Sequence, residues 1–108
     1  MILHLDPEML EWFSHWPGEF EWDAGNEQKN EKHGISFSDI ETIFGSPVYL
    51  AGKIVEDREE PRWLLLGETK SKGWALIITT RGQKIRVVSC RRQRKKEAEF
   101  YEKLKKEV

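Results

Sequence analysis

The sequence of 108 residues contains a single cysteine, Cys90, so no disulfide can form within the chain. Cys90 also has no second cysteine or histidine at metal-ligand spacing, so we expect no metal site. Nothing else in the sequence indicates a cofactor. A lone thiol is typical of a protein that stays in a reducing compartment, and we therefore expect a cytoplasmic protein.

Long apolar runs are also absent, and none approaches the roughly 18–20 residues that a membrane-spanning helix requires. The first eight residues, Met1–Glu8, lack the basic start of a secretory signal. Hydrophobic residues make up 38% and charged residues 34% of the chain, a composition typical of a folded domain with no membrane partner. A chain of this length is the size of one domain with one core.

The net charge of −1 is small, but the charges are separated along the chain. Residues 1–60 hold fourteen Asp and Glu against four Lys and Arg, a balance of −10. Residues 81–106 hold eleven Lys and Arg against three Glu, a balance of +8. A local field of that sign attracts polyanions such as nucleic acids. The alternative is that the basic run is only the solvated surface of a helix start.

The basic half centres on residues 84–96. Residues 84–89 alternate along the chain, which predicts a strand with Ile85, Val87 and, by strict alternation, Ser89 on one side and Arg86 and Val88 on the other. Residues 91–96 contain no apolar side chain, and residues 97–104 then show the period of a helix. The strand therefore ends in arginines, whose forked donors match a phosphate.

The remaining elements follow from periodicity and from turn residues. Residues 1–18 read as an appendage that forms a short helix, packed on the domain or on a partner, and residues 19–108 as a single domain. Within that domain we predict a strand at 19–23, helices at 24–33 and 36–44, strands at 48–56, 62–68, 74–80 and from 84, and a helix at 93–107. This order of strand, two helices, four strands and a helix predicts an α+β fold, with an antiparallel sheet of about four to five strands packed against helices.

Several segments form an ordered series: Phe20-Glu21-Trp22-Asp23, then Asn26, Lys29-Asn30-Glu31-Lys32-His33-Gly34-Ile35-Ser36-Phe37, Ile43-Phe44-Gly45-Ser46-Pro47, Arg62 with Leu66-Gly67, the apolar strand Leu76–Thr80, and Ile85-Arg86-Val87-Val88-Ser89-Cys90-Arg91-Arg92 with Glu97 and Tyr101. This series resembles the BrnT-type toxins of bacterial toxin–antitoxin pairs. The resemblance covers about residues 19–104. It implies a RelE-like fold and a small ribonuclease whose partners are an RNA substrate and a BrnA-like antitoxin with a DNA-binding domain. It also implies contact with operator DNA through the complex.

Cleavage of RNA without a metal requires a base for the 2′-hydroxyl, cations for the phosphorane and an acid for the 5′-oxygen. The residues that we predict to be catalytic are His33, Lys32, Arg86 and Arg91. The residues that we predict to bind RNA are Lys29, Arg81, Ser89, Arg92, Arg94 and Tyr101. Histidine suits the proton-transfer role because it titrates near neutral pH.

Each of these assignments has a plainer alternative. His33 precedes Gly34, where a histidine can satisfy the last carbonyls of a helix. Tyr101 lies on the apolar side of the last predicted helix and can belong to the core. The whole chain can instead be a non-catalytic module that binds RNA or an antitoxin, or a partner in a DNA-binding complex. Incubation of the purified protein with RNA in EDTA distinguishes the enzyme from the binding module.

Overall fold

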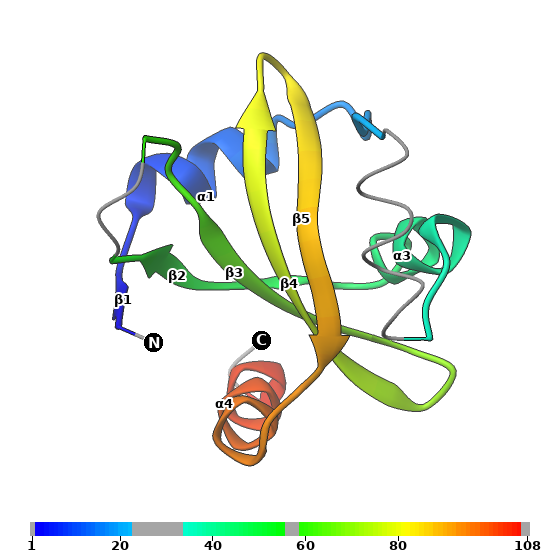
Figure 1. The fold of residues 1–108 in the computed structure, drawn as a ribbon. Helices are drawn as coiled ribbons and strands as arrows, with labels where there is room; N and C mark the ends of the chain where they lie inside the picture. The colour runs from blue at the N-terminus through cyan, green and yellow to red at the C-terminus, as the bar shows by residue number, and fades with distance from the viewer. Residues whose placement is uncertain (1, 23–33, 56–58, 107–108) are drawn as a thin grey trace.

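The computed structural model describes residues 2–22, 34–55 and 59–106 (Figure 1). Its five antiparallel strands lie in the order β1-β2-β3-β4-β5. The strands are β1 (Leu3–His4), β2 (Tyr49–Ile54), β3 (Trp63–Thr69), β4 (Lys72–Arg81) and β5 (Lys84–Arg92), and the helices are α1 (Pro7–Ser14), α3 (Phe37–Ile43) and α4 (Lys95–Lys106). The predicted α+β class is confirmed. Within the described ranges, none of the helices has the length and apolarity to cross a membrane.

The sheet has an apolar cluster on each side. On one side of the sheet, which we call the α1 face, the strand residues pack with Met9 of α1 and with Ile40 and Ile43 of α3. The strand residues of the α1 face are Trp63, Leu65, Trp74, Leu76, Ile78, Ile85, Val87 and Cys90. Tyr101 of α4 packs on the opposite side, which we call the α4 face and which carries Ala51, Ile54, Leu64, Leu66 and Ala75. Burial on both sides explains why β3 is apolar almost throughout rather than alternating.

A bulge in β5 decides which of its side chains reach the α4 face. Ile78 pairs with Val87 but Ile77 pairs with Ser89, so Val88 is an extra residue in the strand. Before the bulge, Ile85 and Val87 point to the α1 face; after it, Cys90 does. The bulge therefore shifts the alternation by one residue, and the arginines on either side of it can share one face.

The described segment that follows α1 departs from the prediction. Residues 19–22 do not form a regular strand; Phe20 makes a single parallel bridge with Ile85. The Glu21 amide donates to the Ile85 carbonyl at 2.9 Å, and the Ile85 amide donates to the Glu19 carbonyl at 3.0 Å. The predicted strand at 19–23 is thus wrong for its described residues, because its aromatic side chains pack into a cluster instead of pairing along β5. Asp23 and the predicted helix at 24–33 lie outside the described residues.

The first eighteen residues pack on the sheet, as one of the two alternatives predicted. Met9 is only 4% exposed and belongs to the cluster on the α1 face. Asp6 caps α1 by accepting from the Met9 amide at 3.2 Å, and it also accepts from Trp63 Nε1 of β3 at 2.8 Å. The strand β1 was not predicted, because two residues are too few to show an alternation. It pairs with the end of β2, where Leu3 lies opposite Ile54.

Candidate nucleic-acid interface

Three of the predicted site residues come from β5 and share the α4 face. Arg86 alternates with Ile85 and Val87, which are buried on the α1 face, and it lies opposite Thr79. Beyond the bulge, Ser89 and Arg91 alternate with Cys90 in the same way. The fold therefore brings Arg86, Ser89 and Arg91 to one side of the sheet. Strict alternation placed Ser89 on the side of Ile85 and Val87, opposite Arg86, and that placement is wrong because the bulge at Val88 shifts the alternation.

A third arginine, Arg62, reaches this face from just before β3. Arg62 directly precedes Trp63, which pairs with Ile78, so it lies beside Thr79 on the next strand. The Thr79 hydroxyl donates to the Pro61 carbonyl at 2.8 Å, and the Arg62 carbonyl accepts from the Ile54 amide at 2.8 Å, so the backbone of Arg62 is fixed. We call Arg62, Thr79 and Arg86 the arginine row. Adjacent strands lie about 4.8 Å apart, which separates the two arginine Cα atoms by about 10 Å.

The arginine row has a small, buried centre and cationic ends. Thr79 is 1% exposed, so its side chain adds little bulk between the two arginines. The Nε of Arg62 is buried, and among the described residues it has no hydrogen-bond partner. A buried donor without a partner costs stability, which makes it a candidate contact for a ligand. Our sequence analysis left Arg62 out of the site, although its alternation with Leu64 and Leu66 places it on the same face.

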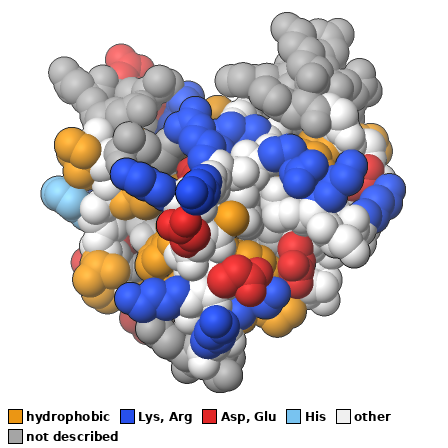
Figure 2. Space-filling model, turned by 90° about the horizontal axis from the view of Figure 1, so that it is seen from below, with side chains coloured by type: hydrophobic (Ala, Val, Ile, Leu, Met, Phe, Trp, Pro, Cys, Tyr) orange, Lys and Arg blue, Asp and Glu red, His pale blue; other side chains and the backbone are white. Residues whose placement is uncertain are grey.

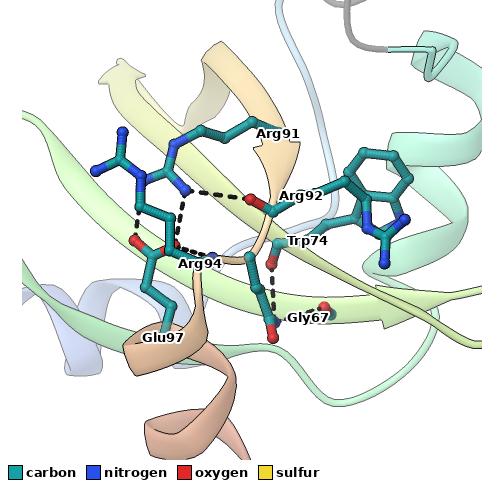
Figure 3. Close-up of polar contacts among 7 residues, drawn as sticks. Gly67, Trp74, Arg91, Arg92, Arg94 and Glu97 are labelled. Atoms are coloured by element: carbon teal, nitrogen blue, oxygen red, sulfur yellow. Dashed lines mark hydrogen bonds and ion pairs between the residues drawn. The ribbon is translucent and has the colours of Figure 1, made fainter.

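Arg91 makes a different contact, with the first turn of α4 (Figure 3). Its Nη1 and Nη2 donate to the two carboxylate oxygens of Glu97 at 2.7 and 2.9 Å. The Arg94 amide donates to the same carboxylate at 2.8 Å. The two hydrogen bonds to Glu97 raise the pKa of Arg91 above its ordinary value. Burial disfavours the Glu97 carboxylate, but the hydrogen bonds from Arg91 and Arg94 outweigh it, so the pKa of Glu97 is lowered.

Three other predicted RNA-binding residues, Arg81, Arg92 and Arg94, are not part of the arginine row. The Arg92 guanidinium lies over the Trp74 ring, 5.7 Å from its centroid, and Trp74 belongs to the α1 face (Figure 3). Arg81 forms ion pairs with Glu60 and, at 3.5 Å, with Glu21. The exposed side chain of Arg94 lies where β5 leads into α4.

Tyr101 lies in the core, packed against Tyr49 with ring centroids 5.7 Å apart, and only 3% of it is exposed. Burial, together with the nearby charge of Glu68, raises the pKa of Tyr101 to about 12. Burial likewise raises the pKa of the Cys90 thiol to about 12, although the charge of Arg91 opposes it. Both groups are therefore protonated at neutral pH, and Tyr101 has little surface to offer an RNA.

Three predicted residues, Lys29, Lys32 and His33, lie outside the described residues. Their approach to the arginine row stays a prediction. In the part of the chain that the structure describes, no three His, Cys, Asp or Glu side chains are grouped so that they could hold a metal ion.

The surface around α4 is rich in cations. Figure 2 views the molecule from the side on which α4 lies, and Lys and Arg side chains are spread over it, with Asp and Glu side chains between them. The charges are thus mixed, and the Glu97 carboxylate is already engaged by Arg91. A polyanion can therefore be held at particular points, of which the arginine row is one, rather than over a uniformly basic surface.

Comparison with known protein families identifies a match. The family model described as the ribonuclease toxin BrnT of type II toxin–antitoxin systems matches residues 22–97, which is more than half of the chain. The matched segment spans α3, β2 to β5 and the first turn of α4, and so includes every residue of the arginine row. No curated protein and no solved structure matches the chain significantly.

Proposed function

Because the chain belongs to the BrnT family of ribonuclease toxins of type II toxin–antitoxin systems, we propose that it cleaves RNA by metal-independent acid–base chemistry at the arginine row. Cleavage of RNA inhibits translation and growth. The family also implies a cognate antitoxin. For this chain we propose a BrnA-like antitoxin whose DNA-binding domain brings the complex to operator DNA, and we propose that both proteins act in the cytoplasm.

The observation that carries the proposal is the placement of Arg62 and Arg86 on either side of Thr79 on the α4 face. Two guanidinium groups about 10 Å apart at the backbone can reach one phosphate from opposite sides, since each side chain is several bonds long. Charge-assisted hydrogen bonds from a fork are among the strongest that a protein makes to a phosphate. They stabilise most where negative charge develops, on the non-bridging oxygens of the phosphorane.

The proton transfers are assigned to residues of the family pattern. His33 takes the proton of the 2′-hydroxyl, whose oxygen attacks the adjacent phosphorus, and the bond from phosphorus to the 5′-oxygen breaks. A protonated group, for which Lys32 is the candidate, supplies the proton that the departing 5′-oxygen needs. The products are a 2′,3′-cyclic phosphate and a 5′-hydroxyl, so no water and no metal-bound hydroxide enters the step.

The remaining predicted residues are proposed to act around this centre. The flanking nucleotides contact Lys29, Arg81, Ser89 and Arg94. Arg92 binds RNA where the strand passes over the edge of the sheet toward the α1 face. Tyr101 supports α4 from the core. Arg91 contributes chiefly by holding α4 through Glu97, since both ends of its fork are engaged there. A direct catalytic role for Arg91 stays a prediction.

The test uses purified protein and an RNA of defined sequence in EDTA. The proposal expects cleavage with 2′,3′-cyclic phosphate ends, and an RNA with a 2′-deoxy sugar at the cut site should not be cleaved. Retention of intact RNA without cleavage would support a non-catalytic binding module instead. Cleavage that appears only when a divalent metal is added would contradict the proposed mechanism but not the family assignment.

A further inference from the structure

A cleft of about 470 Å³ opens between α4 and the first three strands, beside the arginine row. Its floor is aliphatic and consists of Leu3, Ala51, Leu64 and Leu66. Phe100 of α4 forms one wall and is 40% exposed. Clefts that bind small ligands or a few side chains of a peptide have volumes of this order.

The rim of the cleft is basic. Arg94, Lys95 and Lys96 line it at the start of α4, and all three side chains are exposed. Cations in the first turn of a helix are unfavourable, because the unpaired amides there already carry positive charge. Glu97, the acidic residue of this turn, also lines the cleft, but its side chain is only 15% exposed and is ion-paired with Arg91. The first turn of α4 therefore presents a concentrated positive charge next to an apolar floor.

This combination favours a peptide over an RNA. RNA bases are held by aromatic or guanidinium planes and by hydrogen bonds to their edges. Here Phe100 and Arg94 belong to the wall and the rim, whereas the floor is made of leucine and alanine. Leucine-like side chains of a partner fit such a floor. Carboxylates that flank them in the partner sequence would face Lys95 and Lys96.

We propose that this cleft binds an acidic segment of the cognate antitoxin that carries apolar side chains. The inference rests on the proposed function, because it identifies the antitoxin's docking site on a ribonuclease toxin. Leu64 in the floor is two residues from Arg62 along the chain, or about 7 Å in an extended strand. A segment that leaves the cleft along β3 would thus cover the arginine row and block access of RNA to it.

The test measures binding of the full-length cognate antitoxin to the full-length toxin by calorimetry, with no RNA present. The double variant Lys95→Glu/Lys96→Glu should weaken the affinity at least about tenfold. It should also fold, because acidic residues are favourable in the first turn of a helix. Phe100→Ala removes an exposed apolar wall without a change of charge, and it should weaken binding by several-fold.

Lys103→Glu/Lys106→Glu is the matched control, since it reverses two exposed charges at the other end of α4. The proposal expects this control to bind the antitoxin within about twofold of the wild type. Equal losses of antitoxin affinity in the two double variants would mean that the antitoxin is attracted by the overall charge of α4 and not bound in the cleft, and this result would overturn the proposal. Normal antitoxin binding by Lys95→Glu/Lys96→Glu would also overturn the proposal. If that variant loses RNA binding instead, the cleft is an RNA site; if it loses self-association, the cleft is a contact between two copies of the chain.

The result is independent of cleavage. A toxin that fails to cleave RNA but loses its antitoxin in Lys95→Glu/Lys96→Glu would refute the proposed reaction and support the docking site. If the wild-type toxin cleaves RNA but neither Lys95→Glu/Lys96→Glu nor Phe100→Ala changes its affinity for the antitoxin, the proposed reaction is supported and the docking site is refuted.

Discussion

Arg91 at the end of β5 and Glu97 in the first turn of α4 form a two-point ion pair, with bonds of 2.7 and 2.9 Å. Only 17% of the Arg91 side chain and 15% of the Glu97 side chain are exposed. The same carboxylate accepts the Arg94 amide at 2.8 Å, which is one of the amides left unpaired at the start of a helix. One carboxylate therefore joins the last strand to the last helix.

The first prediction is that Arg91→Ala lowers the free energy of unfolding by about 2–3 kcal/mol, because it leaves a largely buried Glu97 carboxylate without its partner. Urea denaturation measures the change. Arg92→Ala is the control, since it removes only an exposed contact with the Trp74 ring and should cost about 0.5–1 kcal/mol. Equal losses in the two variants would show that the ion pair adds nothing beyond an ordinary surface contact.

The second prediction concerns how the stability that Glu97 contributes depends on pH. The pKa of Glu97 is lowered in the folded protein from its ordinary value of 4.5, so the ion pair contributes its full stability above that pH. This contribution is lost as the pH falls through the folded-state pKa, where the carboxylate takes up a proton. Glu97→Gln should be less stable than the wild type near pH 7, and the difference should shrink below about pH 4.5.

Thermal unfolding of both proteins between pH 2.5 and 7 measures this difference. The pKa values of Asp6 and Asp39 are lowered as well, Asp6 chiefly by its hydrogen bond from Trp63 and Asp39 chiefly by Lys70. Both residues remain in each protein, so their contributions cancel in the comparison. A difference that stays constant down to pH 2.5 would show that Glu97 acts by shape alone.

The sequence predicted the sheet well because β3 and β4 carry long apolar segments, and because short turns join β3 to β4 and β4 to β5. Lys70 and Ser71, which join β3 to β4, adopt left-handed conformations with φ of 54° and 62°, as tight hairpins require. Two features escaped prediction. The strand β1 has only two residues, and the aromatic alternation around Phe20 reflects packing against Phe44 and Trp16 rather than pairing along a strand.

The site was predicted less completely, for a geometric reason. Alternation along β5 placed Arg86 correctly opposite Ile85 and Val87, but it could not reveal the bulge at Val88. The partners of Arg91 and Arg92 depend on that bulge, because it sends one arginine to α4 and the other to the Trp74 ring. Arg62 was noted only as part of the family pattern and was not predicted to be a site residue. The sequence does not show which residues of separate strands lie side by side in the sheet, and Arg62 and Arg86 are 24 positions apart.

The third prediction tests whether the first eighteen residues are part of the folded unit. Asp6 joins α1 to β3, because it caps the helix and accepts from Trp63 Nε1. Asp6→Ala should lower the free energy of unfolding by about 1–2 kcal/mol through loss of the cap and of the bond to Trp63. Tryptophan fluorescence during denaturation measures this change in the free energy of unfolding. Ser36→Ala, which removes the cap of α3 but no contact between elements, should cost only about 1 kcal/mol.

The last prediction concerns the arginine row and His33. Arg62→Ala, Arg86→Ala and His33→Ala should each lower the rate of RNA cleavage by about two orders of magnitude, the usual scale for one charge-stabilising donor or one acid–base group.

Arg62→Lys and Arg86→Lys are the informative controls, because lysine keeps the charge and loses the fork. A large loss in the lysine variants would indicate that the guanidinium contacts the phosphate at two points, whereas near-normal rates would indicate that charge alone suffices. Each variant needs a melting temperature beside its cleavage rate, since His33 can instead cap a helix end. If His33→Ala melts early but its folded fraction cleaves at the full rate, His33 is structural. The base must then be sought among Lys29 and Lys32, because burial keeps the Tyr101 hydroxyl protonated at neutral pH.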